Sequence, residues 1–352
     1  MKFGIFDYVD RRDEPLAKTF DERLALLRAA EAMGFYGYHV TEHHATPLAA
    51  TPSPTVWLAA AARETHRIRL GALLFLLPLY NPLRLIEELC VLDHITHGRL
   101  DIGVGRGISP HEFKAMNVPF EQSEAMFAEG LEVLLKGLQN DVLDHHGKYY
   151  QFDDVPLPFR PYQKPYPPLW YGLRSAEGHE RPARHGMNGV ALGPADRVAL
   201  TLANYRAAWK RYADDPKRAT SPVKEPIVGA MRVMFIGESD EAAERLARPA
   251  FRQWFDALAW LWVRRGDFPP IAVSADYDEA RRAGTLVVGS ADTVRRELVA
   301  QAERVGFDYL VLQVAFGTLG HANEMRSLQL FEQEVMPALQ AVSARMPSLA
   351  LA

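Results

Sequence analysis

The sequence predicts one (β/α)8 barrel, and three observations support this fold class. Strand-like and helix-like segments alternate from the first residues onward. The strand-like segments are apolar throughout instead of alternating, as expected for parallel strands buried on both faces. Eight such strand-like segments occur, and they are not arranged as the two similar halves of a Rossmann fold. A chain of 352 residues also suffices for such a barrel, which needs roughly 250 residues plus insertions.

The expected elements follow one another in regular order. Strands are predicted where short apolar runs occur, at residues 2–7, 36–41, 68–75, 99–104, 169–172, 189–192, 227–235 and 309–314. Helices are predicted between them, at residues 21–33, 54–65, 82–95, 123–139, 196–212 and 322–339. The first helix places Leu24, Leu27 and Ala30 on one face. The third opens with Pro82, which suits a first helical turn.

Two intervals of the chain are too long to be short loops between neighbouring elements. Residues 145–168 contain six prolines, and residues 254–287 combine aromatic and charged stretches. Long loops in a compact domain are often lids or binding loops. We therefore expect a lid insertion at about residues 254–287. Because no internal repeat or linker divides the chain, residues 1–352 are expected to form a single barrel domain.

Composition excludes several classes of function. The net charge is −4 and the basic residues are scattered, so no nucleic-acid or membrane partner is expected. The longest apolar run, residues 70–79, is about half of what a bilayer span needs. The N-terminus reads as a buried strand and not as a secretion signal. The single cysteine, Cys90, forms no intramolecular disulfide, which favours a cytoplasmic location.

The run Glu42-His43-His44 is the strongest chemical motif in the chain. It directly follows the predicted strand 36–41. Paired imidazoles beside a carboxylate can exchange protons near neutral pH. The alternative interpretation is a polar loop without a catalytic or binding role. Catalytic groups of a (β/α)8 barrel lie at the C-terminal ends of its strands, which is where this run lies.

A glycine-rich run follows the fourth predicted strand, at residues 103–107. In a dinucleotide fingerprint the third glycine opens a helix, whereas here Arg106 stands before Gly107 and a loop continues through Ile108. Glycines on both sides of Arg106 would let the backbone approach a flat ligand while the guanidinium meets a phosphate. The alternative is a tight turn that carries a surface arginine.

A second candidate anion site follows the fifth predicted strand, at Arg174, Ser175, Ala176 and Gly178. Ser175 can cap the helix that follows and donate to an anion at the positive end of that helix. Arg174 adds a cation beside it. A plain helix cap is the alternative, but Arg106 and Ser175 together predict a phosphate site.

Metal and nucleophile chemistry are less well supported. His39, His43 and His44 are close in sequence, but strand 1 ends without a His-X-His pair and no later strand end carries a second histidine cluster. Residues 144–147 read as a solvated turn. No metal site is therefore expected. The chain also lacks a Gly-X-Ser-X-Gly nucleophile elbow.

These residues resemble those of the bacterial luciferase-like flavin-dependent monooxygenases over roughly residues 1–340. The resemblance rests on motifs spread along the chain: Lys2-Phe3-Gly4, Glu42-His43-His44, Leu77-Pro78, Asn81-Pro82-Leu83-Arg84, Leu92-Asp93, Gly98-Arg99-Leu100, Gly105-Arg106-Gly107, Val288-Gly289-Ser290 and Val335-Met336-Pro337.

The resemblance implies reduced FMN at the C-terminal mouth of the barrel. Arg106 and Ser175 would hold its phosphate, and the backbone of residues 105–108 would run along the flavin. His43 matches the family's catalytic acid/base beside a flavin C4a oxygen adduct, with Glu42 able to bias its tautomer and His44 as its neighbour. The flavin-binding residues implied in all are Leu73, Leu74, Phe75, Gly105, Arg106, Gly107, Ile108, Arg174, Ser175, Ala176 and Gly178. The family's non-prolyl cis peptide would fall at Leu73–Leu74, and its mobile lid at residues 254–287.

The chain departs from luciferase itself at three positions. Gly105 stands in place of a reactive cysteine, Arg174 in place of an acidic residue, and Gly178 in place of a phosphate-contacting threonine. These departures argue against a simple transfer of light emission or aldehyde specificity to this chain.

The resulting prediction is an FMNH2-dependent, two-component monooxygenase with O2 as co-substrate. A separate flavin reductase is expected because the chain contains no nicotinamide-binding module. Leu74, Phe75 and Leu77 favour a largely apolar small-molecule substrate. An F420-dependent hydride-transfer oxidoreductase of the same fold and a non-catalytic flavin-binding relative are the alternatives. A homodimer is expected, with the small residues at 59–62 permitting close helix packing.

Overall fold

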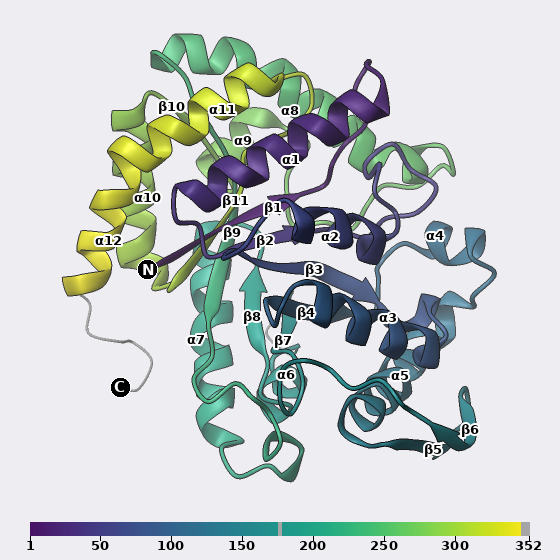
Figure 1. Cartoon of the computed structure of the whole chain (residues 1–352). Coiled ribbons are helices and arrows are strands. Elements are labelled where there is room, and N and C mark those ends of the chain that lie inside the picture. The colour runs from purple at the N-terminus through teal and green to yellow at the C-terminus, as the bar shows by residue number, and fades with distance from the viewer. Residues whose placement is uncertain (175–177, 346–352) are drawn as a thin grey trace.

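Eight parallel strands close into a barrel in the computed structural model, which describes residues 1–174 and 178–345 (Figure 1). In barrel order these strands are β1 (Lys2–Asp7), β2 (Gly37–Val40), β3 (Arg69–Leu76), β4 (Leu100–Gly105), β7 (Leu169–Leu173), β8 (Asn188–Ala191), β9 (Val228–Ile236) and β11 (Tyr309–Gln313). Parallel pairing of β11 with β1 and of β8 with β9 closes the ring. The predicted (β/α)8 fold is confirmed.

Helices surround the barrel. They are α1 (Leu16–Ala32), α2 (Pro54–Arg63), α3 (Pro82–Ile95), α4 (Pro110–Ala115), α5 (Ser123–Gln139), α6 (Glu180–Arg184), α7 (Ala195–Arg211), α8 (Asp240–Val263), α9 (Tyr277–Arg282), α10 (Ala291–Val305), α11 (His321–Leu330) and α12 (Met336–Arg345). Figure 1 shows α11, in yellow, beside α1, in purple, so the two ends of the chain meet on one side of the barrel. Local signals set several boundaries: Asn81 caps α3 through the backbone N–H of Leu83, and Gly306 ends α10 at a φ of 69°.

Side chains in the barrel interior form a separate apolar cluster from those between strands and helices. Tyr309 crosses the interior, and Gly4 and Gly37 leave space for its ring: a Cβ on Gly4 would lie 1.9 Å from the Tyr309 hydroxyl oxygen. That hydroxyl lies 2.8 Å from His39 Nε2. Burial lowers the pKa of His39 to about 4, so the imidazole is neutral near pH 7.

Buried charges fasten the ends of the chain together. Arg23, on α1, lies 3.1 Å from Asp10 and 2.8 Å from Glu324 on α11. Arg12 forms a second ion pair with Glu324. Asp10 also accepts a hydrogen bond from the backbone N–H of Gly317, which follows β11. These ion pairs bind the loop after β1 to the last part of the barrel.

Three segments differ from the expected elements. Residues 142–156 form a hairpin of β5 (Val142–His146) and β6 (Gln151–Pro156), whose turn is held by the Glu129 carboxylate on α5. The expected closing helix 322–339 is two helices joined by a π-helical turn, Phe331–Val335. The expected lid begins inside α8, because residues 254–263 are helical, and it continues through α9 to β10 (Leu286–Gly289), which pairs with β9.

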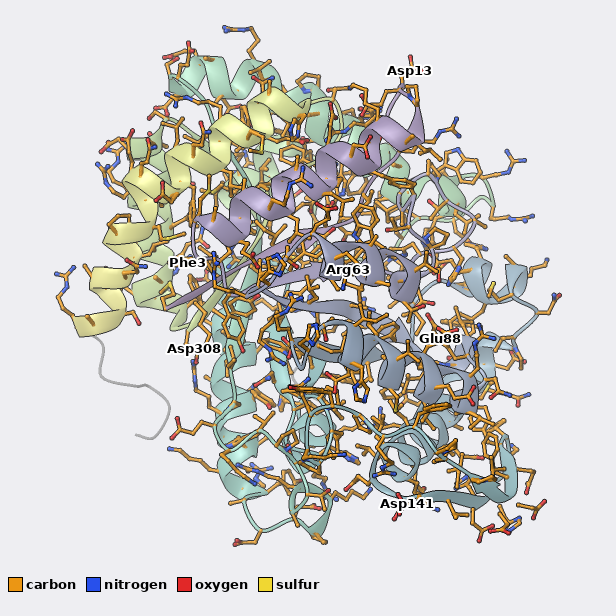
Figure 2. All side chains as sticks on the ribbon, viewed as in Figure 1. Phe3, Asp13, Arg63, Glu88, Asp141 and Asp308 are labelled. Carbon is orange, nitrogen blue, oxygen red and sulfur yellow. The ribbon has the colours of Figure 1, made fainter. Side chains whose placement is uncertain are left out.

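The surface carries the charged side chains, with Asp13, Arg63 and Asp141 projecting outward (Figure 2). Cys90 is buried, as expected for a small core residue. In the described part of the chain, no helix combines the length and the apolarity that crossing a membrane requires.

Candidate active site at the barrel mouth

Residues from three strand ends meet at the C-terminal mouth. Glu42, His43 and His44 follow β2, Arg106 follows β4, and Arg174 follows β7. Because these strands are all parallel in one closed sheet, their carboxyl ends lie at the same side of the barrel. Ser175 and Ala176, two of the predicted phosphate-binding residues, lie outside the described residues.

The His43 imidazole is held by two neighbours. Its Nδ1 lies 2.9 Å from Glu112 Oε1, on the short helix α4. Its ring stacks on Tyr8, with centroids 5.9 Å apart and an interplanar angle of 23°. Tyr8 in turn contacts Trp254 of α8. A carboxylate can only accept a hydrogen bond, so Glu112 favours the tautomer that carries hydrogen on Nδ1. The unprotonated Nε2 is then available as a base.

Glu42 forms its hydrogen bond with His44 and not with His43, the histidine that it was expected to orient. Its Oε1 accepts from His44 Nε2 at 2.8 Å, and its Oε2 accepts from the backbone N–H of Leu76 at 2.9 Å. Glu42 therefore orients His44 and the end of β3, while Glu112 takes the role toward His43 that the sequence suggested for Glu42. Burial lowers the pKa of His44, but the hydrogen bond and charge of Glu42 outweigh burial, so this pKa is raised overall.

The end of β3 has an unusual backbone. The peptide bond between Leu73 and Leu74 is cis, at the position where the resemblance places it. Leu74 lies against the glycines of β4: a Cβ on Gly105 would come within 2.5 Å of Leu74 Cδ1. Leu73 faces the barrel interior, whereas Phe75 belongs to the apolar layer between strands and helices. Phe75 and Leu77 therefore do not form the wall of the mouth that the sequence suggested.

Three arginines form a cationic cluster at the mouth. Arg197, on α7, donates to the backbone carbonyl of Arg174 at 3.3 Å. Burial lowers the pKa of Arg174, and the positive charges of Arg106 and Arg197 lower it further. The repulsion between these like charges would be relieved by an anion bound among them. Arg106 is partly exposed and 4.0 Å from Glu124, so its guanidinium is accessible to a ligand.

Gly107 and Gly178 complete the predicted phosphate region. Gly107 has a φ of +87°, a conformation that favours glycine, and lies under the ring of Phe113. Ile108 lines a small pocket beside His43. Gly178 lies in a turn before α6.

The pocket beside His43 is closed. Besides His43 and Glu112, it is lined mainly by apolar side chains, among them Leu48, Ile108, Leu258, Leu261, Trp262 and Ile271. Its cavity volume of about 20 Å³ is room for one water molecule. Residues 269–271 and the last turns of α8 cover it, and Arg174 donates to the carbonyl of Pro270 at 3.1 Å. A larger molecule reaches His43 only after this cover moves.

Sequence reasoning missed Glu112, Tyr8 and Arg197. Tyr8 follows the first predicted strand by one residue, so its place at a strand end was a usable signal. Glu112 lies 69 positions from His43, and Arg197 lies on an ordinary amphipathic helix. Only the closed barrel brings those two residues to the mouth.

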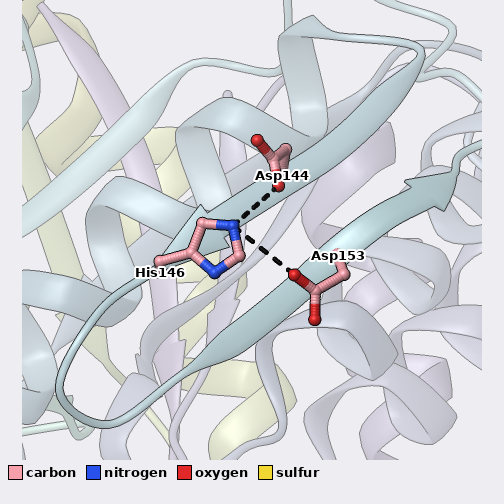
Figure 3. A group of neighbouring side chains, drawn as sticks. All are labelled: Asp144, His146 and Asp153. Carbon is pink, nitrogen blue, oxygen red and sulfur yellow. Dashed lines mark ion pairs between the residues drawn. The ribbon is translucent and has the colours of Figure 1, made fainter.

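A metal-like group lies away from the mouth, on the β5–β6 hairpin. Within the described residues, Asp144, His146 and Asp153 are grouped closely enough to share an ion (Figure 3). His146 Nε2 lies 3.2 Å from Asp144 and 3.5 Å from Asp153, and all three are exposed. Residues 144–147 were expected to form a solvated turn. Asp144 and His146 are exposed as expected, but residues 144–146 form the end of a strand and not a turn. Its other histidine, His145, is buried and lies 3.4 Å from Glu129.

Comparison with known proteins identifies the family. A family model described as luciferase-like monooxygenase matches residues 1–309. This chain belongs to the luciferase-like monooxygenases. It is 34% identical to the uncharacterized protein y4wF of Sinorhizobium fredii, covering 96% of each chain. It is 27% identical to the oxygenase component of the flavin-dependent trigonelline monooxygenase of Acinetobacter baylyi, covering 96% of this chain and 95% of that protein.

Solved structures agree with this assignment. Monooxygenase RslO1 from Streptomyces bottropensis superimposes with a TM-score of 0.84 at 28% identity, covering 96% of this chain and 99% of that one. At 22% identity, the oxygenating constituent of 3,6-diketocamphane monooxygenase from Pseudomonas putida, in complex with FMN, shares the fold with a TM-score of 0.79 over 96% and 98% of the two chains. A coenzyme F420-dependent reductase from Methanopyrus kandleri also shares it, at 18% identity, a TM-score of 0.70 and coverage of 96% and 99%. The predicted family and enzyme class are confirmed.

Proposed function

We propose that this luciferase-like monooxygenase is the oxygenase component of a two-component system. A separate reductase would supply FMNH2, and the enzyme would use O2 to oxygenate a largely apolar small molecule. One observation carries the proposal: His43, held by Glu112, lies at the same barrel mouth as the cationic cluster of Arg106, Arg174 and Arg197. The printed name of the trigonelline relative, a flavin-dependent oxygenase component, supports the cofactor and the separate reductase.

The residues at the mouth fit a flavin phosphate. The three arginines form a site for a dianion, and guanidinium groups bind phosphate with charge-assisted hydrogen bonds. Gly105 carries no side chain, so Leu74 packs directly against the backbone of β4, and a glycine backbone suits the close approach of a flat ring. When bound, reduced FMN supplies the electrons that activate O2.

His43 is the proposed acid/base. With hydrogen held on Nδ1 by Glu112, its Nε2 takes a proton from the reacting oxygen or substrate and returns it later. The cover of residues 269–271 and the α8 side chains Leu258, Leu261 and Trp262 shield the imidazole, which is 20% exposed. A dry site protects oxygen chemistry from wasteful release of peroxide.

The lining of the pocket supports an apolar substrate. Leu48, Ile108, Leu258, Leu261 and Ile271 offer hydrocarbon surface, whereas the polar groups are gathered at His43 and Glu112. This division suits an apolar molecule with one polar reacting group. Because the pocket is closed, residues 254–287 are proposed to open as a lid before the substrate binds.

We also propose a homodimer in the cytoplasm. Val56 on α2 and Val91 on α3 are 70% and 53% exposed, on two helices that pack side by side. Exposed apolar side chains on neighbouring helices favour burial against a second copy. Light scattering should give twice the chain mass, and Val56→Asp together with Val91→Asp should shift it to the monomer. The single buried Cys90 fits a reducing compartment.

Anaerobic binding of reduced flavins tests the proposed cofactor. We expect FMNH2 to bind more tightly than reduced riboflavin, which lacks the phosphate. Arg106→Ala should weaken FMNH2 by about 10- to 100-fold, the equivalent of one charge-assisted hydrogen bond. The same change at the exposed Arg282 is the control. Preferential binding of reduced F420 would instead overturn the proposal in favour of a hydride-transfer oxidoreductase.

Rapid mixing of the loaded enzyme with oxygenated buffer tests the role of His43. The bound flavin should reoxidise more slowly than free FMNH2, as followed by its absorbance. His43→Gln should keep FMNH2 affinity but change this reoxidation rate. An unchanged rate would remove His43 from the proposed chemistry.

A further inference from the structure

A large cavity lies outside the closed His43 pocket, between the start of α1, the loop of residues 45–50 and the last turns of α8. We call it the outer groove, and its volume is about 610 Å³. Its lining is Arg11, Glu14, Pro15, Leu16, Ala45, Thr46, Pro47, Ala49, Ala50 and Trp260. A cavity of this size accommodates an organic molecule the size of an ordinary cofactor or drug. The His43 pocket, by contrast, has room for one water molecule.

The outer groove has an apolar body and a cationic rim. Leu16 and Trp260 are 44% and 40% exposed and both line this groove, where they offer apolar surface to a ligand. The Glu14 carboxylate pairs with Lys18, which also pairs with Glu22, and accepts a hydrogen bond from Thr19. Within the described residues, no carboxylate lies in ion-pair contact with the Arg11 guanidinium. Arg11 therefore offers the groove a guanidinium without an ion-pair partner.

A second arginine lies next to Trp260, although it is not itself part of the groove lining. The Arg264 guanidinium lies 5.3 Å from the centroid of the Trp260 ring. Two arginines next to an exposed indole suit a ligand that carries an anionic group on an apolar or aromatic body. A cationic ligand would be repelled here, and a purely apolar one would leave the charge of Arg11 without a partner.

Thr46 separates the outer groove from the His43 pocket, because it lines both. Its Oγ1 donates to the backbone carbonyl of Ala257 on α8 at 3.2 Å and accepts from Leu48 N at 3.2 Å. On α8, Trp260 faces the groove while Leu258 and Leu261 face the pocket. The outer groove and the His43 pocket are therefore separated by Thr46 and helix α8. These two are joined by a hydrogen bond between uncharged groups, which contributes about 1 kcal/mol.

We propose that the outer groove binds an organic anion with an apolar body, and that such a molecule reaches the His43 pocket from it when Thr46 releases α8. The second half rests on the proposed function, since it takes the anion as substrate. The first half is independent of any chemistry at His43. The groove is also separate from the flavin phosphate site, which the arginines at the ends of β4 and β7 form.

A fluorescent aromatic sulfonate, 8-anilinonaphthalene-1-sulfonate, is the probe for the first half. With FMN saturating the mouth, we expect one saturable site per chain. Arg11→Gln should weaken binding about fivefold at low salt, as for an exposed ion pair, and Trp260→Ala about tenfold. Arg265→Gln and Val263→Ala, exposed changes next to the groove, are the controls. If all four variants bind the probe as tightly as the wild type does, the proposed binding site is wrong.

Chemical modification of His43 by diethyl pyrocarbonate, read by mass spectrometry, tests the second half without turnover. Saturating probe in the groove should slow the modification of His43 at least threefold. Thr46→Val, which removes the hydrogen bond to Ala257, should speed it in the absence of probe. If the probe binds but the modification rate of His43 is the same with and without it, the groove does not lead to the pocket. Failure of either result leaves the flavin assignment untouched, because neither measurement uses the reduced cofactor.

Discussion

The tautomer of His43 is the most direct consequence of the site geometry. Glu112 Oε1 lies 2.9 Å from His43 Nδ1, and the Glu112 side chain is only 6% exposed. A hydrogen bond from an imidazole to a buried carboxylate contributes about 1.5–3 kcal/mol. Since about 1.4 kcal/mol corresponds to a factor of ten, hydrogen on Nδ1 is favoured about 10- to 100-fold over hydrogen on Nε2. Glu112→Ala removes this preference, because no carboxylate then holds the Nδ1 hydrogen.

Nuclear magnetic resonance of protein labelled with 15N-histidine measures the tautomer without a substrate. In the wild type, the His43 signals should show Nδ1 protonated and Nε2 bare. Glu112→Ala should move them toward a mixture of the two tautomers, while His43→Gln assigns the signals. Glu42→Gln is the matched control, since Glu42 contacts His44 and should leave the His43 signals in place. Identical His43 signals in Glu112→Ala and the wild type would refute the reasoning.

Three further predictions concern the mouth and the barrel interior. Arg174→Ala should weaken FMN binding in calorimetry about 10-fold or more while leaving riboflavin affinity unchanged; an equal loss for both ligands would exclude a phosphate contact. Gly103→Ala should destabilise the fold by about 3 kcal/mol in urea unfolding, because its Cβ would lie 2.2 Å from the Ala72 carbonyl oxygen. Gly105→Ala should cost less than about 1.5 kcal/mol, since there a flexible leucine side chain can move aside; equal losses would contradict the difference. His39 has a pKa lowered by burial from 6.5 to about 4, so its contribution of about 3 kcal/mol is complete above pH 6.5 and is lost as the pH falls toward 4. His39→Gln should flatten this dependence in unfolding experiments at pH 7.5 and 5, and an unchanged slope would assign the acid sensitivity elsewhere.

The barrel strands were readable from the sequence because burial on both faces makes each strand an uninterrupted apolar run. All eight were predicted to within about two residues. The β5–β6 hairpin was missed because it packs on one face only: Leu143 is buried, whereas the side chains of Val142 and Asp144 on either side of it are exposed. Burial on a single face of so short a strand leaves too weak an alternation to identify.

The candidate site was predicted in its local parts and missed in its long-range pairs. His43 and Arg106 follow their strands directly, so each was visible where a strand ends. The partner of His43 was assigned to Glu42, its neighbour in sequence, although the closed barrel instead brings Glu112 from 69 positions away. Sequence separation hides such pairs, because the geometry that joins them exists only after β2, β3 and β4 have paired.

The ion pair of Arg23 with Glu324 joins residues 301 positions apart, and this distance has a consequence during synthesis. A ribosome adds roughly 5–20 residues per second, so Arg23 waits about 15–60 s for its partner to be made. Strand β1 waits as long for β11, the strand that completes one of its two edges. The nascent chain therefore carries an unsatisfied strand edge through most of translation, whereas Arg23 already has Asp10 beside it and lacks only Glu324. In the interval before the last strand emerges, the free edge of β1 is open to pairing with another chain.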